Sequence, residues 1–168
     1  VLLDAPCTAT GTRRRNPEVL RATKPADVAK LADVQHRLLD AAAQPVHPAT
    51  LIQPHTLRLV LVLLYGTGLR AGEALRLRSC DVDLRDHLLT IWDTKFFKSR
   101  FVPIGTDLCR ALSQYHTDRT RLPLADGERS VFFTTRRGRA ITLGRLETAF
   151  TRLLRQTHVG QGHPGHRP

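Results

Sequence analysis

The 168-residue sequence contains no methionine and only three cysteines, Cys7, Cys80 and Cys109. An odd number of cysteines without C-x-x-C spacing argues against a disulfide framework and a zinc ribbon, and it fits a chain kept in the reducing cytoplasm. No apolar run reaches the roughly 18 residues needed to cross a bilayer, and no signal-peptide pattern opens the chain. We therefore expect a cytoplasmic protein with no membrane partner. Because the chain starts within an apolar run, we also expect Val1 to lie inside a longer reading frame.

Acidic side chains are scarce. The chain has 15 Asp and Glu against 26 Lys and Arg, which gives a formal net charge of +11 at pH 7. A strongly basic chain favours a polyanionic partner. Residues 44–168 carry 19 of the basic and 10 of the acidic side chains, so a nucleic acid is expected on this later part. The alternative is an arginine-rich composition in which solvated arginines cover every surface without a common partner.

Hydrophobic residues make up 41% of the chain, which is enough to bury a core. Residues 1–43 are expected to form a unit of their own: a short strand, a polar loop and a helix over residues 25–43 with one apolar stripe. Strand, loop and helix in this order are typical of an α/β fragment. The proline-containing stretch 44–50 predicts a linker or junction, which leaves residues 51–168 as a second domain.

The second domain is expected to be mainly helical with a small antiparallel β-sheet. Gly66-Thr67-Gly68 breaks an apolar helix, because glycine permits the backbone to reverse direction. The expected elements are, in order, a helix over 55–66, a helix from Arg70 to Leu77, a polar turn at 81–84, paired strands at 88–92 and 97–104, a helix beginning at 105–107, a strand at 130–134 and a helix after Thr142.

Two segments of this domain carry the strongest signal. The first is Thr67-Gly68-Leu69-Arg70-Ala71-Gly72-Glu73, and the second is Thr94-Lys95-Phe96-Phe97-Lys98-Ser99-Arg100-Phe101-Val102-Pro103. Together they resemble the catalytic domain of the tyrosine recombinases, the phage-type integrases. The resemblance implies double-stranded DNA as the partner, joined by further recombinase protomers in the full-length family.

The resemblance also implies a chemistry of DNA strand breakage and rejoining. In the family a tyrosine attacks the scissile phosphate to form a phosphotyrosyl link, without a metal or any other cofactor. Arg70 matches the first of two arginines that hold the phosphate oxygens, and Lys95 matches the lysine that protonates the leaving 5′-oxygen. Glu73 would orient Arg70, while Lys98 and Arg100 would contact backbone phosphates.

The nucleophile is not expected among the tyrosines of this sequence. Tyr65 and Tyr115 both fall in apolar helical stripes, which predicts packing roles. In the family a His-x-x-Arg helix and the nucleophilic tyrosine come later in the chain order, and the corresponding segments are not found before Pro168. His163 and His166 belong to a histidine-containing tail rather than to a metal site. We therefore expect weak duplex binding without cleavage; a non-catalytic basic DNA-binding module is an alternative.

A second resemblance covers the first unit. Asp4-Ala5-Pro6-Cys7 is similar to a motif of the Sun/Nop-type RNA cytosine-5 methyltransferases, in which this loop lies by the target base and the cysteine assists product release. The glycine-rich loop for S-adenosylmethionine and the second, nucleophilic cysteine of that family are not in the sequence. Asp4, Pro6 and Cys7 are the residues that carry this methyltransferase-like motif, and we expect Cys7 to be an inert small residue in this chain. Part of an rRNA cytosine-5 methyltransferase remains the alternative assignment.

Overall fold

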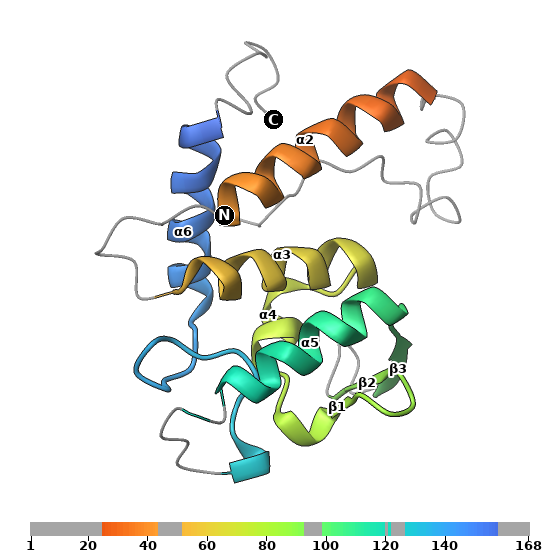
Figure 1. The fold of residues 1–168 in the computed structure, drawn as a ribbon, viewed down its shortest axis with the longest axis vertical. Helices are drawn as coiled ribbons and strands as arrows, with labels where there is room; N and C mark the ends of the chain where they lie inside the picture. Colours follow the sequence, from red (N-terminus) through yellow and green to blue (C-terminus); the bar gives the residue numbers. More distant parts are fainter. Residues whose placement is uncertain (1–24, 44–51, 93–98, 120, 122–126, 158–168) are drawn as a thin grey trace.

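The computed structural model describes residues 25–43, 52–92, 99–119, 121 and 127–157 (Figure 1). The described part is mainly helical with one small antiparallel sheet, as predicted. Its elements are α2 (Pro25–Ala43), α3 (Pro54–Thr67), α4 (Ala71–Arg76), η2 (Ser79–Asp81), β1 (Val82–Asp83), β2 (Leu88–Ile91), β3 (Arg100–Pro103), α5 (Thr106–Arg119), η3 (Gly127–Arg129) and α6 (Leu143–Thr157). The strand and loop predicted before α2 lie outside the described residues.

Helix α3 forms the centre of the fold. Its sequence is apolar on nearly every side, and its buried residues are Thr56, Leu57, Leu59, Val60, Leu61 and Leu63. The helix begins at Pro54, where the missing N–H of proline is harmless. It ends at Gly68, which has φ 64° and donates its N–H to the Leu64 carbonyl. Because glycine adopts this left-handed conformation without penalty, the chain turns sharply here and leads into α4.

Helices α2 and α5 lie on either side of α3 (Figure 1). Leu38 and Ala42 of α2 are fully buried, and they belong to the same hydrophobic cluster as the residues of α3. Helix α2 also packs against α6. We expected residues 1–43 to form a unit of their own. Within the described residues, α2 shares its hydrophobic core with the helices that follow. The predicted junction at 44–50 is outside the described residues.

The sheet has the strand order β1-β2-β3, and both pairs are antiparallel. The predicted hairpin of β2 and β3 is confirmed, with Ile91 paired to Arg100 and Thr90 to Phe101. The turn predicted at 81–84 is wrong in part, because Val82 and Asp83 form the short strand β1. The Asp83 carboxylate accepts two backbone N–H groups of the following turn, and this arrangement closes the β1–β2 connection.

The strand predicted at 130–134 is also wrong. Among the described residues, the segment does not pair continuously with another strand. It makes two isolated β-bridges there, between Arg78 and Val131 and between Thr134 and Ala140. The chain reverses at once, because the Gly138 N–H donates to the Thr135 carbonyl. What fixes the segment is aromatic packing: Phe132 and Phe133 are fully buried, with ring centroids 5.1 Å apart in an edge-to-face arrangement.

Arg119, at the end of α5, is a buried cation with neutral partners. Its side chain donates to the Ser79 hydroxyl, to the Ser130 hydroxyl at 2.8 Å and to the Val131 carbonyl. Its guanidinium also lies 5.6 Å from the centre of the Phe132 ring. Burial lowers the pKa of Arg119 from its ordinary value, and the nearby Tyr115 phenol, when ionised, opposes this shift. Arg119 therefore ties α5 to η2 and to the 130–132 segment.

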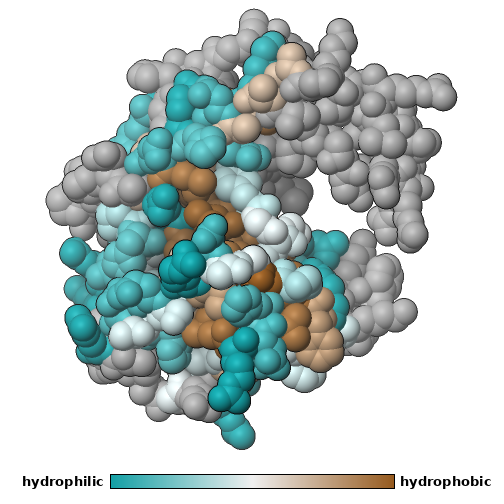
Figure 2. Space-filling view, turned by 45° about the vertical axis from the view of Figure 1, so that its right-hand side comes forward, coloured by the Kyte–Doolittle hydropathy of each residue, from teal (hydrophilic) through white to brown (hydrophobic). Residues whose placement is uncertain are grey.

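The surface is divided between apolar and polar regions. Figure 2 shows hydrophobic residues gathered in the centre of one face, with hydrophilic residues around them. The largest exposed apolar side chains of the described part are Trp92, Phe101 and Leu143. None of the helices that the structure describes is long and apolar enough to cross a membrane.

Candidate functional site

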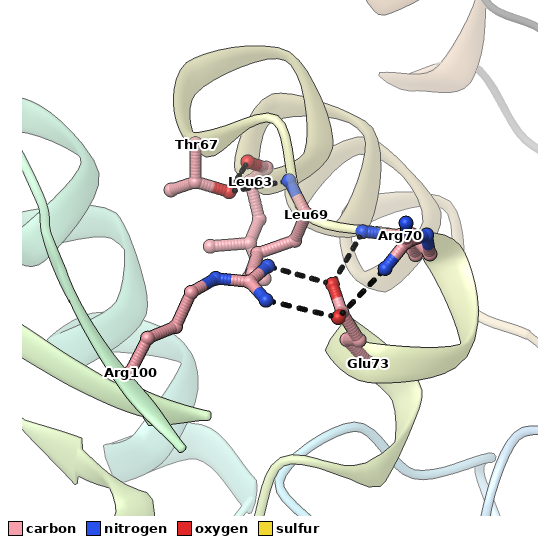
Figure 3. Close-up of polar contacts among 6 residues, drawn as sticks. All are labelled: Leu63, Thr67, Leu69, Arg70, Glu73 and Arg100. Carbon is pink, nitrogen blue, oxygen red and sulfur yellow. Dashed lines mark hydrogen bonds and ion pairs between the residues drawn. The ribbon is translucent and has the colours of Figure 1, made fainter. Parts of the chain in front are cut away.

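The loop before α4 places Arg70. Thr67, in the last turn of α3, donates its hydroxyl to the Leu63 carbonyl at 2.6 Å and accepts the Leu69 N–H at 3.4 Å (Figure 3). Leu69 is buried, and Arg70 follows with an extended backbone (φ −70°, ψ 145°) at the N-cap of α4. The glycine turn and the buried leucine therefore fix where the Arg70 side chain leaves the backbone.

Glu73 closes the first turn of α4. Its side chain is 3% exposed, and one carboxylate oxygen, Oε2, accepts the Arg70 backbone N–H at 2.9 Å. The other oxygen, Oε1, lies 3.5 Å from Nη1 of the Arg70 guanidinium, whose side chain is 67% exposed. A buried carboxylate thus holds the base of an exposed arginine. This geometry is what the proposed orienting role of Glu73 requires.

Arg100 of β3 approaches Glu73 from the other side (Figure 3). Its Nη1 and Nη2 donate to Oε1 and Oε2 of Glu73 at 3.2 and 2.9 Å, a two-point ion pair between residues 27 positions apart. We expected Arg100 to contact DNA phosphates; in the structure its guanidinium is engaged by Glu73, although the side chain is still 41% exposed. No local pattern in the sequence indicates this link between α4 and the sheet.

The electrostatics of Glu73 follow from these contacts. Burial alone would raise the pKa of Glu73. The hydrogen bonds from Arg100 and from the Arg70 N–H, together with the positive charges of both guanidiniums, outweigh burial and hold the pKa of Glu73 below its ordinary value. Glu73 is therefore ionised at neutral pH, and its charge stabilises the folded chain.

We expect Glu73→Gln to lower the free energy of unfolding by about 1–2 kcal/mol at pH 7, because the amide cannot form either ion pair. The contribution of a carboxylate with a lowered pKa is complete above its unfolded pKa and is lost as the pH falls through the folded pKa. The difference between the two proteins should therefore be largest above pH 4.5, the ordinary value for Glu, and shrink below it. Urea unfolding at several pH values measures it.

Glu147→Gln is the matched control for this prediction. Glu147 lies on α6, is partly exposed and has no ion pair within the described part of the chain. The same change of charge there should leave stability and its pH dependence nearly unchanged. An equal loss in both variants would contradict the role given to Glu73.

Several predicted site residues cannot be placed. Lys95 and Lys98, predicted as general acid and phosphate contact, lie outside the described residues. The same holds for the methyltransferase-like residues Asp4, Pro6 and Cys7. Within the described ranges, no group of three or more His, Cys, Asp or Glu side chains could hold a metal ion.

The two tyrosines of the sequence are packing residues in the structure. Tyr115 is 5% exposed, and its hydroxyl accepts the Thr134 N–H at 3.1 Å. The Tyr65 hydroxyl is buried without a partner among the described residues, and burial raises the pKa of Tyr65. The spacing His-x-x-Arg does occur at His116 and Arg119 of α5, but Arg119 is only 2% exposed, and both of its Nη atoms donate to structural partners.

The fold defines a class of protein. The chain is similar to the crystal structure of the XerA recombinase, with a TM-score of 0.62 and 22% identity over 76% of this chain and 42% of that one. It is likewise similar to the XerH site-specific recombinase in a pre-cleavage complex, with a TM-score of 0.59 and 21% identity over 79% of this chain and 38% of that one. The fold is thus that of site-specific recombinases.

The sequence comparison gives the family. The phage integrase family matches residues 31–166, and the chain belongs to this family. It is 33% identical to y4rB of Sinorhizobium fredii, named as an integrase/recombinase, over 81% of this chain and 44% of that protein. It is 42% identical to the tyrosine recombinase XerC of Chlorobaculum parvum over 50% of this chain and 26% of that protein. The chain thus spans less than half the length of these curated relatives.

A second family match overlaps the first. The 16S rRNA methyltransferase RsmB/F family matches residues 1–60. The chain is 50% identical to the ribosomal RNA small subunit methyltransferase B of Xylella fastidiosa over 48 residues, which are 29% of this chain and 11% of that protein. Residues 31–60, which include the second half of α2, fall within both matches.

Proposed function

We propose that this chain binds double-stranded DNA through the surface that carries Arg70 and that, in the complete recombinase, Arg70 binds the scissile phosphate. The observation that supports this most directly is the Arg70 side chain, which is 67% exposed although its backbone N–H and its Nη1 both contact the buried Glu73 carboxylate. A guanidinium held in this way can donate to two phosphate oxygens with little loss of conformational freedom. The XerH structure described above is of a recombinase bound to its difH DNA substrate.

The proposed roles follow the chemistry of phosphoryl transfer. The attacking tyrosine oxygen forms a bond to phosphorus while the bond to the 5′-oxygen breaks, and negative charge develops on the non-bridging oxygens. Arg70 stabilises that charge, and Lys95 gives the departing 5′-oxygen its proton. Lys98 contacts a backbone phosphate. Arg100 contacts a phosphate with its exposed edge while it holds Glu73 in place.

The nucleophile comes from outside the 168 residues. Both tyrosine hydroxyls are buried, and that of Tyr115 is occupied by a backbone N–H. Neither can reach a phosphodiester on the surface. We expect the chain to bind a nicked duplex substrate and to form no covalent adduct with it, as measured by denaturing gel electrophoresis of a labelled substrate. A covalent band that disappears in a Tyr65→Phe or Tyr115→Phe variant would contradict this.

The role of Arg70 is tested by duplex binding. Loss of one phosphate contact in Arg70→Ala should weaken binding about fivefold at low salt. Arg110→Ala is the control, because Arg110 lies on α5 and pairs with Asp107 at 3.0 Å. Fluorescence anisotropy with a labelled duplex measures both. Equal affinities of the wild type and Arg70→Ala would refute the proposed phosphate contact.

We also propose that the protein is located in the cytoplasm. The described cysteines, Cys80 and Cys109, are both free thiols, which supports a reducing cytoplasm. RNA methylation is not part of the proposed function. The methyltransferase match covers 29% of this chain and 11% of the curated enzyme.

A further inference from the structure

A cleft of about 460 Å³ lies between α4, η2 and β2. This α4–β2 cleft is lined by Glu73, Arg76, Leu77, Arg78, Cys80, Asp81, Thr90, Ile91 and Trp92. Its volume falls within the range of about 300–1,000 Å³ that small-molecule sites occupy. The cleft therefore has room for a single nucleotide.

Trp92 is exposed and held in a fixed orientation. It is the only tryptophan of the chain, and it is 59% exposed. Its indole Nε1 donates to Oδ1 of Asp81 at 2.8 Å, and Oδ2 of the same carboxylate accepts the Arg78 backbone N–H at 2.8 Å. Asp81 is itself only 7% exposed. A buried carboxylate thus anchors one edge of the indole while much of the ring remains in solvent.

The charges of the cleft favour an anion. Arg76 and Arg78 are exposed, and neither forms an ion pair with an acidic side chain of the described part. Glu73 is neutralised by Arg100, and the Asp81 oxygens are turned towards N–H groups. The two guanidiniums are therefore available for a ligand.

We propose that the α4–β2 cleft binds an unpaired nucleotide of a DNA strand, with the base stacked on Trp92 and its phosphate held by Arg76 and Arg78. Base stacking needs a free aromatic face on both partners, and a base inside a duplex already stacks on its neighbours. The site therefore selects single-stranded DNA. It extends the proposed DNA binding, but it uses residues other than those assigned to the duplex phosphate.

Trp92 itself reports on the site. Titration with a single-stranded thymidine oligonucleotide of about eight nucleotides should quench the intrinsic fluorescence to a saturating level. An abasic oligonucleotide of the same length and charge should bind about tenfold more weakly and leave the fluorescence unchanged, since stacking of a base on an aromatic side chain is worth about that factor or more. Equal affinity for both oligonucleotides, with no quenching, would overturn the proposal.

Variants separate stacking from charge. By anisotropy with a labelled oligonucleotide, Trp92→Leu should bind about tenfold more weakly, while Trp92→Phe should retain much of the affinity because it keeps an aromatic face. Arg76→Gln and Arg78→Gln should each weaken binding about fivefold. Phe101→Leu is the matched control, because Phe101 is an aromatic residue that is 72% exposed and does not line the cleft. Thermal unfolding checks that each variant is folded.

Binding of duplex DNA distinguishes the proposed single-strand site in the α4–β2 cleft from the proposed duplex contact at Arg70. If Trp92→Leu weakens duplex and single-strand binding equally, the cleft is part of the duplex contact and a single-strand site is refuted. If duplex binding depends on Arg70 while the oligonucleotide fails to quench Trp92, the cleft proposal alone fails. If the oligonucleotide quenches Trp92 but the duplex does not bind, the proposed duplex function fails and the cleft site stands.

Discussion

Leu38→Ala is expected to lower the free energy of unfolding by about 2–5 kcal/mol, the usual range for a leucine truncated in a packed core. Leu38 lies on α2 and is fully buried in the cluster that includes the residues of α3. Because the two helices share one core, the loss should appear in the same cooperative transition as the unfolding of α3 and α6. Urea unfolding of the complete 168-residue chain, followed by circular dichroism, measures it.

Leu143→Ala provides the control for this substitution. Leu143 is the first residue of α6 and is 45% exposed, so the same change should alter stability by only about 0.5 kcal/mol or less. Similar small effects at both positions, or a separate early transition for α2, would show that α2 does not belong to the core. The test matters because the second half of α2 falls within both family matches.

Duplex DNA binding is expected to weaken about 40-fold when NaCl is raised from about 50 mM to about 200 mM, as follows from neutralising about three phosphates. The three proposed phosphates are the scissile one, which Arg70 and Lys95 share, and those contacted by Lys98 and by Arg100. Arg100 must share its guanidinium with Glu73, so it should contribute least. The slope of the logarithm of affinity against the logarithm of salt concentration, measured by anisotropy, gives the number of contacts.

Substitutions refine this measurement. Lys98→Gln should reduce the slope by about 0.9, the value expected for one phosphate contact, while Arg110→Gln on α5 should not change it. A slope near zero for the wild type would contradict the proposed DNA binding. A slope that Lys98→Gln leaves unchanged would remove that residue from the contact.

The local elements could be predicted well from the sequence. Helix α2 begins at Pro25, as expected from a proline in the first turn and an apolar stripe behind it, and α3 ends at the glycine pair that breaks its apolar run. The start of α6 was likewise predicted from Thr142, a residue type that often precedes a helix. In the structure, the backbone N–H groups of Arg145 and Leu146 donate to the Thr142 carbonyl. In each case the signal lies within a few neighbouring residues.

The features that depend on distant residues were not predicted. The pairing of Glu73 with Arg100 joins residues 27 positions apart, and nothing in either segment alone indicates it. The segment 130–134 has the β-branched and aromatic composition of a strand, yet the burial of Phe132 and Phe133 and the turn at Gly138 override that tendency. For the site, the resemblance identified Arg70 and Glu73 as neighbours; the place of Lys95 stays a prediction.

The carboxylate of Glu73 serves two guanidiniums at once, one from the helix start and one from the sheet. A ligand that draws Arg100 away from Glu73 leaves Arg70 as the remaining charged partner of that carboxylate and so alters the freedom of the Arg70 tip. Occupancy at the hairpin and occupancy at Arg70 are then thermodynamically coupled, and the coupling must be reciprocal. If both guanidiniums contact one DNA backbone, as proposed, the shared carboxylate links the two contacts energetically.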